Sequence, residues 1–412
     1  MLADSEVIDS LKRNALDEVG EGDVSRLKQA GVIVDSDLDE VARMEYSIAQ
    51  TKYGRMRALS MFVCFTSQCK LHCVYCFQDH RASVAVALAQ GELQSLLRFV
   101  DREVEERALR RLNVVFFGGE PLMNREMVTA AAEELTNRKS EHLSIDMSLI
   151  TNGTLLNGAV SRLLAEHVAL VQVTLDGPKP IHDGRRPYRN GAGTYEVIMD
   201  NLAEAVELFR SVAVHCVVDS ETAAFVPELL EDLEERGLRR GNVAVSFSPT
   251  YPTQRSLASC PDSVVGLDQA RIVADLFSAA ISRGWCAPFP FLKGPCGRVQ
   301  MDFMAVDEKL QVYKCPGELY GPRPDGVIES DGRLDLIGSN WFESVSSFPA
   351  CAAKCAYGPI CYGGCRWLAG GPKRTFCSRQ ALDATLGGML VAYVRSRHRD
   401  KLLDGTTDVG IL

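Results

Sequence analysis

Three cysteines near residue 70 carry the strongest chemical signal in this sequence. Cys69, Cys73 and Cys76 form a C-x3-C-x2-C pattern inside the segment CFTSQCKLHCVYCFQDH. Three thiolates at this spacing can bind one iron–sulfur cluster and leave one of its iron atoms without a protein ligand. That open iron is a place where a cofactor could bind and where chemistry could begin.

A zinc site and a disulfide network are the two other interpretations of clustered cysteines. Structural zinc sites have four ligands, usually in paired C-x2-C or C-x2-C…H-x3-H spacing, and His72 and His80 fit neither spacing. Disulfide networks belong to short secreted chains. This chain has 412 residues, and its first residues, MLADSEVIDS, lack the basic and apolar regions of a signal peptide. The spacing therefore favours the cluster.

The composition is that of a globular protein from a reducing compartment. Apolar residues make up 46% of the chain, and 45 Lys and Arg against 54 Asp and Glu give a net charge of −9. The chain can therefore bury a sizeable core and has no basic excess for nucleic acid. No apolar run approaches the roughly 20 residues of a membrane-spanning helix. We expect a cytoplasmic protein whose 14 cysteines serve mainly as metal ligands or catalysts.

The sequence around the cysteines alternates between two periodic patterns. Runs rich in β-branched residues predict strands at 59–65, 113–117, 144–150, 169–174, 212–218 and 243–249. Amphipathic patterns predict helices near 91–109, 124–138, 156–166, 194–210 and 224–237. Alternating strands and helices form parallel βαβ units with right-handed crossovers. The predicted fold class is therefore α/β, a partial (β/α)6 TIM-like barrel that is open on one side.

Polar and glycine-rich segments follow the predicted strands. The cysteine loop follows the first strand, GGEP (118–121) the second, TNGT (151–154) the third and LDGP (175–178) the fourth. Each segment by itself could be a simple turn. Ligands of parallel α/β proteins, however, bind at the carboxyl ends of the strands. Four such segments in succession therefore predict a single site at the mouth of the barrel.

These segments resemble the signature of the radical S-adenosylmethionine (SAM) superfamily over roughly residues 58–250. The resemblance implies that Cys69, Cys73 and Cys76 bind a [4Fe–4S] cluster whose fourth iron is chelated by SAM. An aromatic residue precedes the last cysteine, and GGEP matches the segment that holds the methionine amino group. The implied cofactor-binding residues are Tyr75, Gly118, Gly119, Glu120, Pro121, Asn152 and Asp176. The protein would then position and shield a carbon radical formed from SAM.

A second group of cysteines lies downstream in a segment rich in Gly and Pro. Its members are Cys296, Cys315, Cys351, Cys355, Cys361, Cys365 and Cys377. The segment has little apolar periodicity, so metal coordination would have to supply much of its folding free energy. Seven thiols exceed one tetrahedral site and match two sites, one with four ligands and one with three.

This downstream segment resembles the SPASM domain, the auxiliary-cluster module of peptide-modifying radical SAM enzymes. The family run C-x2-C-x5-C-x3-C occurs here with its first gap one residue longer, and Leu310 stands where the family pattern has Gly. The resemblance implies two auxiliary clusters, both of the [4Fe–4S] type, so that the chain would bind three clusters in total. Cys351, Cys355, Cys361 and Cys377 would hold the outer cluster, and Cys296, Cys315 and Cys365 the inner one. The inner cluster has either an open iron or a fourth ligand from Cys286 or Cys260.

Four regions are expected along the chain. Residues 1–57 would form an N-terminal helical cap or partial leader-binding region, with helices near 5–17, 23–30 and 38–50 and a short strand in GVIVD (31–35). Residues 58–285 would form the radical SAM barrel, 286–380 a small iron–sulfur-rich auxiliary domain, and 381–412 a C-terminal helix and tail.

The two-module layout is similar to that of maturases of ribosomally made peptides. Such an enzyme cleaves SAM reductively to a 5'-deoxyadenosyl radical, abstracts hydrogen from a precursor peptide and forms a thioether, ether or C–C crosslink. The implied partners are the precursor peptide, a reductant such as ferredoxin or flavodoxin, and a separate leader-binding protein. Neither nucleic acid nor a membrane is expected.

Three other functions stay open. A sulfatase-maturing, formylglycine-forming enzyme of the family has an acidic residue directly after the second auxiliary cysteine, where this chain has Pro316. A small-molecule dehydrogenase could use the same clusters, and an electron-transfer scaffold would not cleave SAM. The catalytic base is not assigned. Arg185, Arg186 and Arg189 could hold a carboxylate, and the acid–base or radical-relay candidates are Tyr251, Asp302, Asp307 and Tyr313.

Overall fold

The computed structural model describes most of the chain. The described residues are 3–13, 15–29, 32–53, 57–78, 86–251, 266–288, 296–346, 350–351, 354–370, 374–397 and 409–410. His80 and Cys260, the latter suggested as a fourth cluster ligand, lie outside these ranges. All ten cysteines proposed as cluster ligands lie within the ranges.

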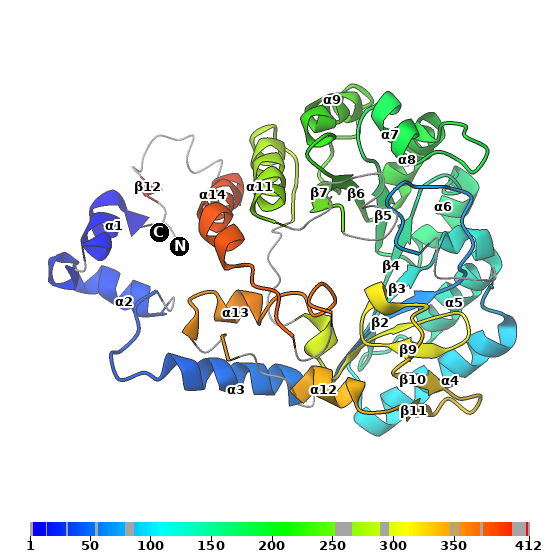
Figure 1. The fold of residues 1–412 in the computed structure, drawn as a ribbon, viewed down its shortest axis with the longest axis horizontal. Helices are drawn as coiled ribbons and strands as arrows, with labels where there is room; N and C mark the ends of the chain where they lie inside the picture. Colours follow the sequence, from blue (N-terminus) through cyan, green and yellow to red (C-terminus); the bar gives the residue numbers. More distant parts are fainter. Residues whose placement is uncertain are drawn as a thin grey trace.

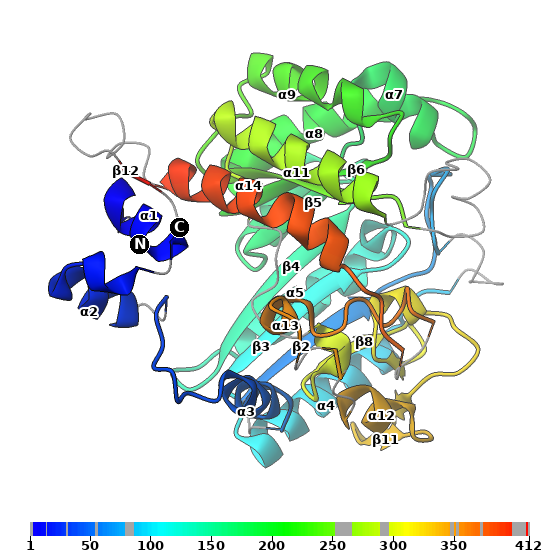
Figure 2. The same cartoon turned by 60° about the vertical axis from the view of Figure 1, so that its left-hand side comes forward.

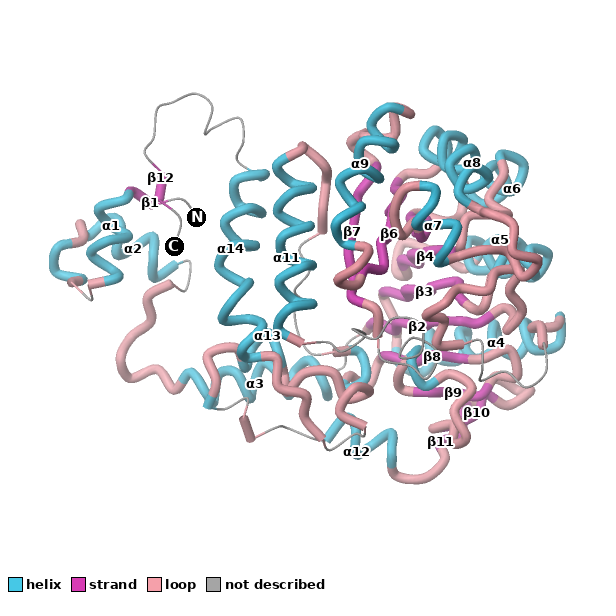
Figure 3. The backbone as a smooth tube through the Cα atoms, turned by 45° about the horizontal axis from the view of Figure 1, so that its top comes forward, coloured by secondary structure: helices cyan, strands magenta, loops and turns pink. Residues whose placement is uncertain are grey.

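The centre of the molecule is a ten-stranded sheet with the order β11-β10-β9-β8-β2-β3-β4-β5-β6-β7. Its parallel part runs through β2 (Ala58–Cys64), β3 (Arg111–Phe117), β4 (Ser144–Thr151), β5 (Leu170–Thr174), β6 (Ser211–Val218) and β7 (Val243–Pro249). Neighbouring strands are consecutive in sequence, as expected for βαβ units. The predicted α/β fold with six parallel strands is confirmed, and Figure 3 shows these strands side by side.

Helices cover the outer face of this sheet (Figure 1). They include α4 (Gln90–Arg107), α5 (Arg125–Asn137), α6 (Gly158–Ala165), α8 (Tyr195–Leu208) and α9 (Val226–Glu235), close to the predicted ranges. In α4 the stripe of Leu93, Leu96, Leu97 and Val100 is buried against the sheet, as its helical period requires. A short helix, α7 (Lys179–Arg185), occupies a segment for which no helix was predicted.

The downstream segment continues the same sheet. The strand β8 (Phe303–Val306) pairs in parallel with β2, and β9 (Gln311–Tyr313), β10 (Gly326–Ile328) and β11 (Leu334–Leu336) follow in antiparallel order. Leu310, in the tight turn before β9, has φ of 62°. This left-handed conformation favours Gly, which explains why the family pattern has Gly at this position.

Two long helices pack on each other beside the sheet. Helix α11 (Leu267–Ser282) contacts α14 (Arg379–Arg397) through a small apolar cluster that includes Phe277, Ile281 and Met389. Figure 2 shows the two helices side by side. Short helices α12 (Asn340–Ser346) and α13 (Gly358–Cys361) lie in the connection that leads to α14. No helix among the described residues is long and apolar enough to cross a membrane.

The N-terminal region is helical, with α1 (Ser5–Lys12), α2 (Glu21–Gln29) and α3 (Glu40–Tyr53). Its first residues, β1 (Ala3–Asp4), pair with β12 (Val409–Gly410). The strand predicted in GVIVD is wrong for its described part, 32–35. The N–H groups of Val32 and Ile33 donate to Leu27 O at 2.9 and 3.4 Å. These bonds close the end of α2, so the backbone is not available for a sheet ladder.

Candidate active site and cysteine groups

A cavity of about 190 Å3 lies where the parallel strands end. Cys69, Cys73 and Cys76 line one side, and Gly118, Gly119, Thr151 and Asn152 line another. These residues come from the loops after β2 and β3 and from the carboxyl end of β4, so three of the four predicted segments meet at this edge of the sheet; no residue of LDGP lines the cavity. Tyr75, Arg186 and Arg189 complete the polar part of the wall.

The cysteine thiols in this cavity are partly or fully buried. Burial raises the pKa of Cys69 to about 11 and that of Cys73 to about 12, so binding of iron would displace their protons. Cys69 Sγ accepts hydrogen bonds from Leu71 N at 3.4 Å and Asn152 Nδ2 at 3.7 Å. Such donors are suited to a thiolate ligand. Within the described ranges, no three His, Cys, Asp or Glu side chains gather tightly enough to hold a single metal ion.

The two glycines of GGEP allow a close approach between two loops. Gly118 has φ of 143°, and a Cβ atom there would lie 2.4 Å from Thr66 O. A Cβ atom on Gly119 would lie 2.5 Å from Gln68 O and 2.6 Å from Ser67 O. The N–H groups of Gly119 and Glu120 donate to Thr66 O and Gln68 O, both at 2.8 Å. The GGEP backbone therefore lies directly against the loop that carries the cysteines.

Substitution of Gly119 by Ala should damage the site through this contact. Because the opposing atoms are backbone, the cysteine loop must move, and we expect the free energy of unfolding to fall by about 1–3 kcal/mol. SAM binding should weaken as well. The matched control is Gly91→Ala in the first turn of α4, where an added Cβ meets nothing within 4 Å and helix propensity improves by up to about 1 kcal/mol. Chemical denaturation of both variants tests this, and equal stability would contradict the steric explanation.

Glu120 has a structural role behind the cavity wall. Its carboxylate is fully buried and accepts hydrogen bonds from Thr151 Oγ1 and Asn152 N, both at 2.8 Å, and from Leu122 N at 3.0 Å. Burial raises the pKa of this carboxyl group. The side chain ties GGEP to the next loop, so its contribution to the cavity is indirect. Pro121 begins a short 3-10 helix that ends at Asn124.

Tyr75 and Asp176 form the centre of a buried polar network. The Tyr75 hydroxyl donates to Asp176 Oδ2 at 2.5 Å and accepts from Arg186 Nη1 at 2.6 Å. Asp176 also accepts from Val217 N at 3.1 Å. Arg185 Nε lies 3.6 Å from Asp176 Oδ2, and its guanidinium stacks 4.9 Å from the centre of the Tyr75 ring. Asp176 thus orients the tyrosine that borders the cysteine loop.

The three arginines of the segment HDGRRPYR (182–189) have different environments. Arg185 is buried and donates to Asp219 Oδ2 at 2.5 Å, which is a structural ion pair. Arg189 Nε donates to Cys69 O at 2.9 Å and thereby braces the cysteine loop. Arg186 is 7% exposed, lines the cavity, and has an Nε atom without a hydrogen-bond partner among the described residues. Arg186 is therefore the member best placed to receive a carboxylate.

His182 supports the network from α7. Its Nδ1 accepts from Asp176 N at 3.2 Å, and its Nε2 lies 3.0 Å from Thr194 Oγ1. Because the Thr194 hydroxyl already donates to Arg186 O, Nε2 must carry the proton of a neutral ring. Burial lowers the pKa of His182 from 6.5 to about 4. Protonation at Nδ1 would break the bond to Asp176.

This geometry predicts a pH dependence of stability. Below pH 6.5 the unfolded chain binds a proton at this histidine and the folded protein does not, so stability should fall until pH reaches about 4. The shift corresponds to about 3 kcal/mol in total. In His182→Gln this contribution should be absent, and in His142→Gln, at an exposed position, it should be retained. Denaturation between pH 7 and 4 measures it, and identical slopes for wild type and His182→Gln would contradict the assignment.

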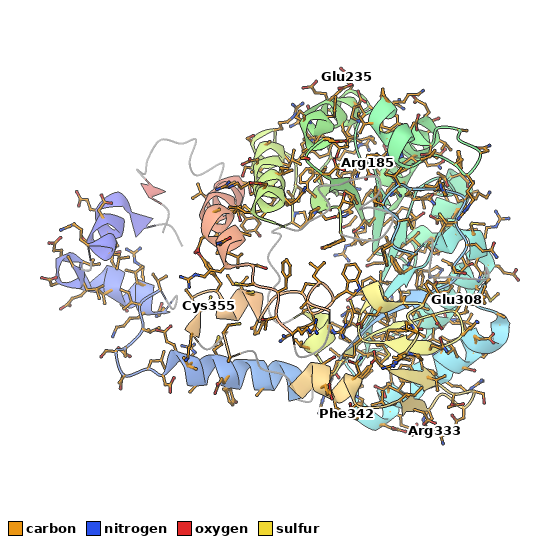
Figure 4. All side chains as sticks on the ribbon, viewed as in Figure 1. Arg185, Glu235, Glu308, Arg333, Phe342 and Cys355 are labelled. Atoms are coloured by element: carbon orange, nitrogen blue, oxygen red, sulfur yellow. The ribbon has the colours of Figure 1, made fainter. Side chains whose placement is uncertain are left out.

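Four of the downstream cysteines share a second cavity. Cys351, Cys355, Cys361 and Cys377 line a space of about 230 Å3 whose wall also includes Leu382 of α14. This set matches the predicted ligands of the outer cluster. In Figure 4 Cys355 lies well apart from Arg185, so this group is separate from the barrel cavity.

The remaining three cysteines also gather together. Burial and the nearby thiols of Cys365, Cys315 and Cys296 raise the pKa of Tyr251, and the thiols of this group also raise one another's pKa. Burial raises the pKa of Cys315 to about 12. Tyr251, which follows β7, stacks edge-on against Trp367 at 5.9 Å between ring centres. A tyrosine from the barrel therefore borders this group, which matches the predicted ligands of the inner cluster.

The other sequence candidates have structural explanations. Asp302 pairs with Arg107 of α4, and Asp307 accepts from Lys309 N and Gln311 N, both at 2.9 Å, in the turn before β9. The Tyr313 ring is buried, and its hydroxyl donates to Gln311 Oε1 at 3.2 Å. Cys286 is exposed, and its carbonyl accepts from Val245 N of β7.

Two buried arginines were missed by sequence reasoning. Arg298 and Arg366 are each 2% exposed and lie beside the downstream cysteines. The sequence signal that could have pointed to them is their closeness to cysteines, since Arg298 lies two residues after Cys296 and Arg366 directly after Cys365. Burial of an arginine cannot be inferred from such spacing alone.

The partial barrel, the three-cysteine loop after β2 and GGEP after β3 define a site of the radical SAM type. Residues 63–233 match the family model described as the Radical SAM superfamily. The chain therefore carries a radical SAM domain, followed by a cysteine-rich C-terminal region that is consistent with a SPASM-like domain.

Known proteins support this assignment. The cysteine-type anaerobic sulfatase-maturating enzyme of Clostridium perfringens strain 13 is 30% identical over 196 residues, which are 45% of this chain. The match spans about half, 51%, of that relative. The structure of anSMEcpe with bound AdoMet and Cp18Cys peptide has a TM-score of 0.62 at 20% identity and covers 82% of this chain and 99% of that one. Streptococcus suis SuiB bound to precursor peptide SuiA has a TM-score of 0.55 at 12% identity, with 91% and 88% covered. Both structures share the fold.

Proposed function

We propose that this chain is a radical SAM enzyme that modifies a peptide or protein substrate. The observation that carries the proposal is the single cavity of about 190 Å3 lined by three cysteines, the GGEP glycines and Asn152. A [4Fe–4S] cluster and SAM bound there would supply a 5'-deoxyadenosyl radical after one-electron reduction. Cys69, Cys73 and Cys76 would hold the cluster.

The surrounding residues have complementary roles in this proposal. Gly118 and Gly119 line the cavity, and their backbone would contact the amino group of SAM. The guanidinium of Arg186 would receive the carboxylate, since its Nε faces no acceptor among the described residues. Asn152 and Tyr75 would line the rest of the cofactor pocket, and the buried Asp176 would hold Tyr75 in place. Apolar Leu71, Phe77, Phe117 and Ile150 also line the cavity and would exclude water from the radical.

The downstream cysteines would hold two auxiliary [4Fe–4S] clusters. The four thiols around the second cavity fit a fully ligated outer cluster. The three-cysteine group beside Tyr251 fits an inner cluster with one open iron. Metal coordination would also stabilise a segment that contains few apolar residues of its own.

The substrate we propose is a ribosomally made precursor peptide, in which the enzyme forms a thioether, ether or C–C crosslink. SuiB, whose structure was solved with a precursor peptide, shares the fold. The partners would be that peptide, a reductant such as ferredoxin or flavodoxin, and a leader-binding protein. Sulfatase maturation is the second candidate, favoured by similarity to the Clostridium perfringens enzyme. Pro316 directly after Cys315 weakens this alternative, because no acidic side chain stands there.

The test is a peptide assay with anaerobically reconstituted, chemically reduced protein. We expect SAM to be cleaved to 5'-deoxyadenosine, and a substrate peptide to lose two hydrogens and gain an internal crosslink in tandem mass spectra. Sulfatase-derived peptides with Cys or Ser test the second candidate, since formylglycine is an aldehyde that a hydrazide reagent traps. Absence of SAM cleavage under reduction would contradict the proposal and leave an electron-transfer role.

A further inference from the structure

Arg366 is a buried cation with unused hydrogen-bond donors. It follows Cys365 directly, is 2% exposed, and is among the largest side chains that the fold buries completely. Its Nη1 donates to Arg374 O. Its Nε and Nη2 have no hydrogen-bond partner in the part of the chain that the structure describes.

The groups around Arg366 belong to both downstream cysteine groups. Burial and the Arg298 guanidinium lower the pKa of Arg366, while the thiols of Cys351 and Cys361 from the outer group and of Cys296 from the inner group oppose this shift. Arg366 is therefore near thiols of both groups, and it directly follows Cys365 of the inner group. Arg298, the other buried arginine here, forms an ion pair with Glu318. No such carboxylate contacts Arg366 among the described residues, so its positive charge is locally unbalanced.

An unbalanced guanidinium is costly to bury. Arginine stays charged in proteins because its pKa is so high, and a buried charge is tolerated only where hydrogen bonds and opposite charge compensate it. The neighbouring acceptors that could do so are the cysteine sulfurs. These sulfurs become anionic thiolates when they bind iron.

We propose that Arg366 donates hydrogen bonds to the sulfur ligands of the two downstream clusters and raises the reduction potential of both. This inference rests on the proposed auxiliary clusters. A nearby positive charge stabilises the more negative, reduced form of a cluster, and hydrogen bonds to its sulfurs act in the same direction. Arg366 is thus a positioning and tuning residue that makes the downstream clusters better electron acceptors.

The test is a potentiometric titration followed by electron paramagnetic resonance. The full chain with Cys69, Cys73 and Cys76 changed to Ala serves as the parent, so that only downstream clusters give a signal. In this parent, Arg366→Gln should lower the ratio of reduced to oxidised cluster at least tenfold at a fixed potential, or about 59 mV for a one-electron couple. Arg366→Lys, which keeps the charge, should change the ratio less than threefold.

A matched control is Arg333→Gln on the turn between β10 and β11, where Arg333 pairs with Asp335 at 2.8 Å. Figure 4 shows Arg333 far from Cys355, and no change in potential is expected. An unchanged potential in Arg366→Gln with normal iron content overturns the inference and leaves the proposed function standing. Loss of iron in both Arg366 variants would make Arg366 a folding residue and also overturn it. A parent chain without iron would overturn the inference and the auxiliary-cluster proposal together.

Discussion

Replacement of Cys69, Cys73 and Cys76 by Ala should abolish SAM cleavage and remove one third of the bound iron. These thiols line the barrel cavity, and without them no cluster can deliver an electron to SAM. At four irons per cubane, the reconstituted protein should fall from about twelve irons to about eight. Production of 5'-deoxyadenosine should fall to the level of a protein-free control. Iron and sulfide analysis beside a SAM-cleavage assay measures both effects.

Cys216→Val is the matched control for this experiment. Cys216 is 2% exposed in the barrel core, on β6, and packs as a small apolar residue. The variant should keep about twelve irons and its SAM-cleavage activity. A fall from about four irons to none in the triple variant would instead mean that the C-terminal cysteines hold no cluster, and the auxiliary-cluster proposal would have to be abandoned.

Replacement of Asp176 by Ala should cause the largest loss of stability among single substitutions at the site. Asp176 is fully buried, accepts from Tyr75 and Val217, and faces Arg185. Its removal leaves guanidinium groups buried with less compensating charge, so the free energy of unfolding should fall by about 3–5 kcal/mol. SAM binding should also weaken, because Tyr75 loses the acceptor that orients it. Denaturant titration and a SAM-binding assay measure the two effects.

Two further variants separate charge from shape in this network. Asp176→Asn keeps the volume and one acceptor oxygen, so its loss of stability should lie between those of wild type and Asp176→Ala. Asp200→Ala removes a carboxylate whose side chain is 77% exposed, and it should change stability by less than about 0.5 kcal/mol. If Asp176→Ala were no more destabilising than Asp200→Ala, the buried network would not stabilise the folded protein.

Much of the barrel could be predicted from the sequence because its signals are local. The alternation of β2 and the apolar stripe of α4 are periodic over fewer than about 20 residues, and burial of one face follows directly from each period. The strand predicted at GVIVD was wrong because the prediction used only this local signal. A run of β-branched residues indicates a strand, but the bonds from Val32 and Ile33 to Leu27 depend on the end of the preceding helix.

The resemblance to known families divided the cysteines into three ligand sets. Two of these sets each line one cavity, the first three cysteines in the barrel and the four cysteines of the outer group. Their identity as cluster ligands stays a prediction. The roles of Asp302 and Asp307 could not be predicted, because an acidic residue in a loop has the same sequence signal whether it pairs with Arg107, caps a turn or acts in catalysis.

The sequence by itself determined the order of the six parallel strands and of the five helices predicted between them, the three-cysteine loop, and the segments that follow these strands. These depend on side-chain chemistry and short-range periodicity. Only the tertiary structure decided that β8 extends the barrel sheet beside β2, that Asp176 holds Tyr75, and that Arg366 is buried near two cysteine groups. Each of these contacts joins distant segments or depends on burial, and both are set by the packing of the whole chain.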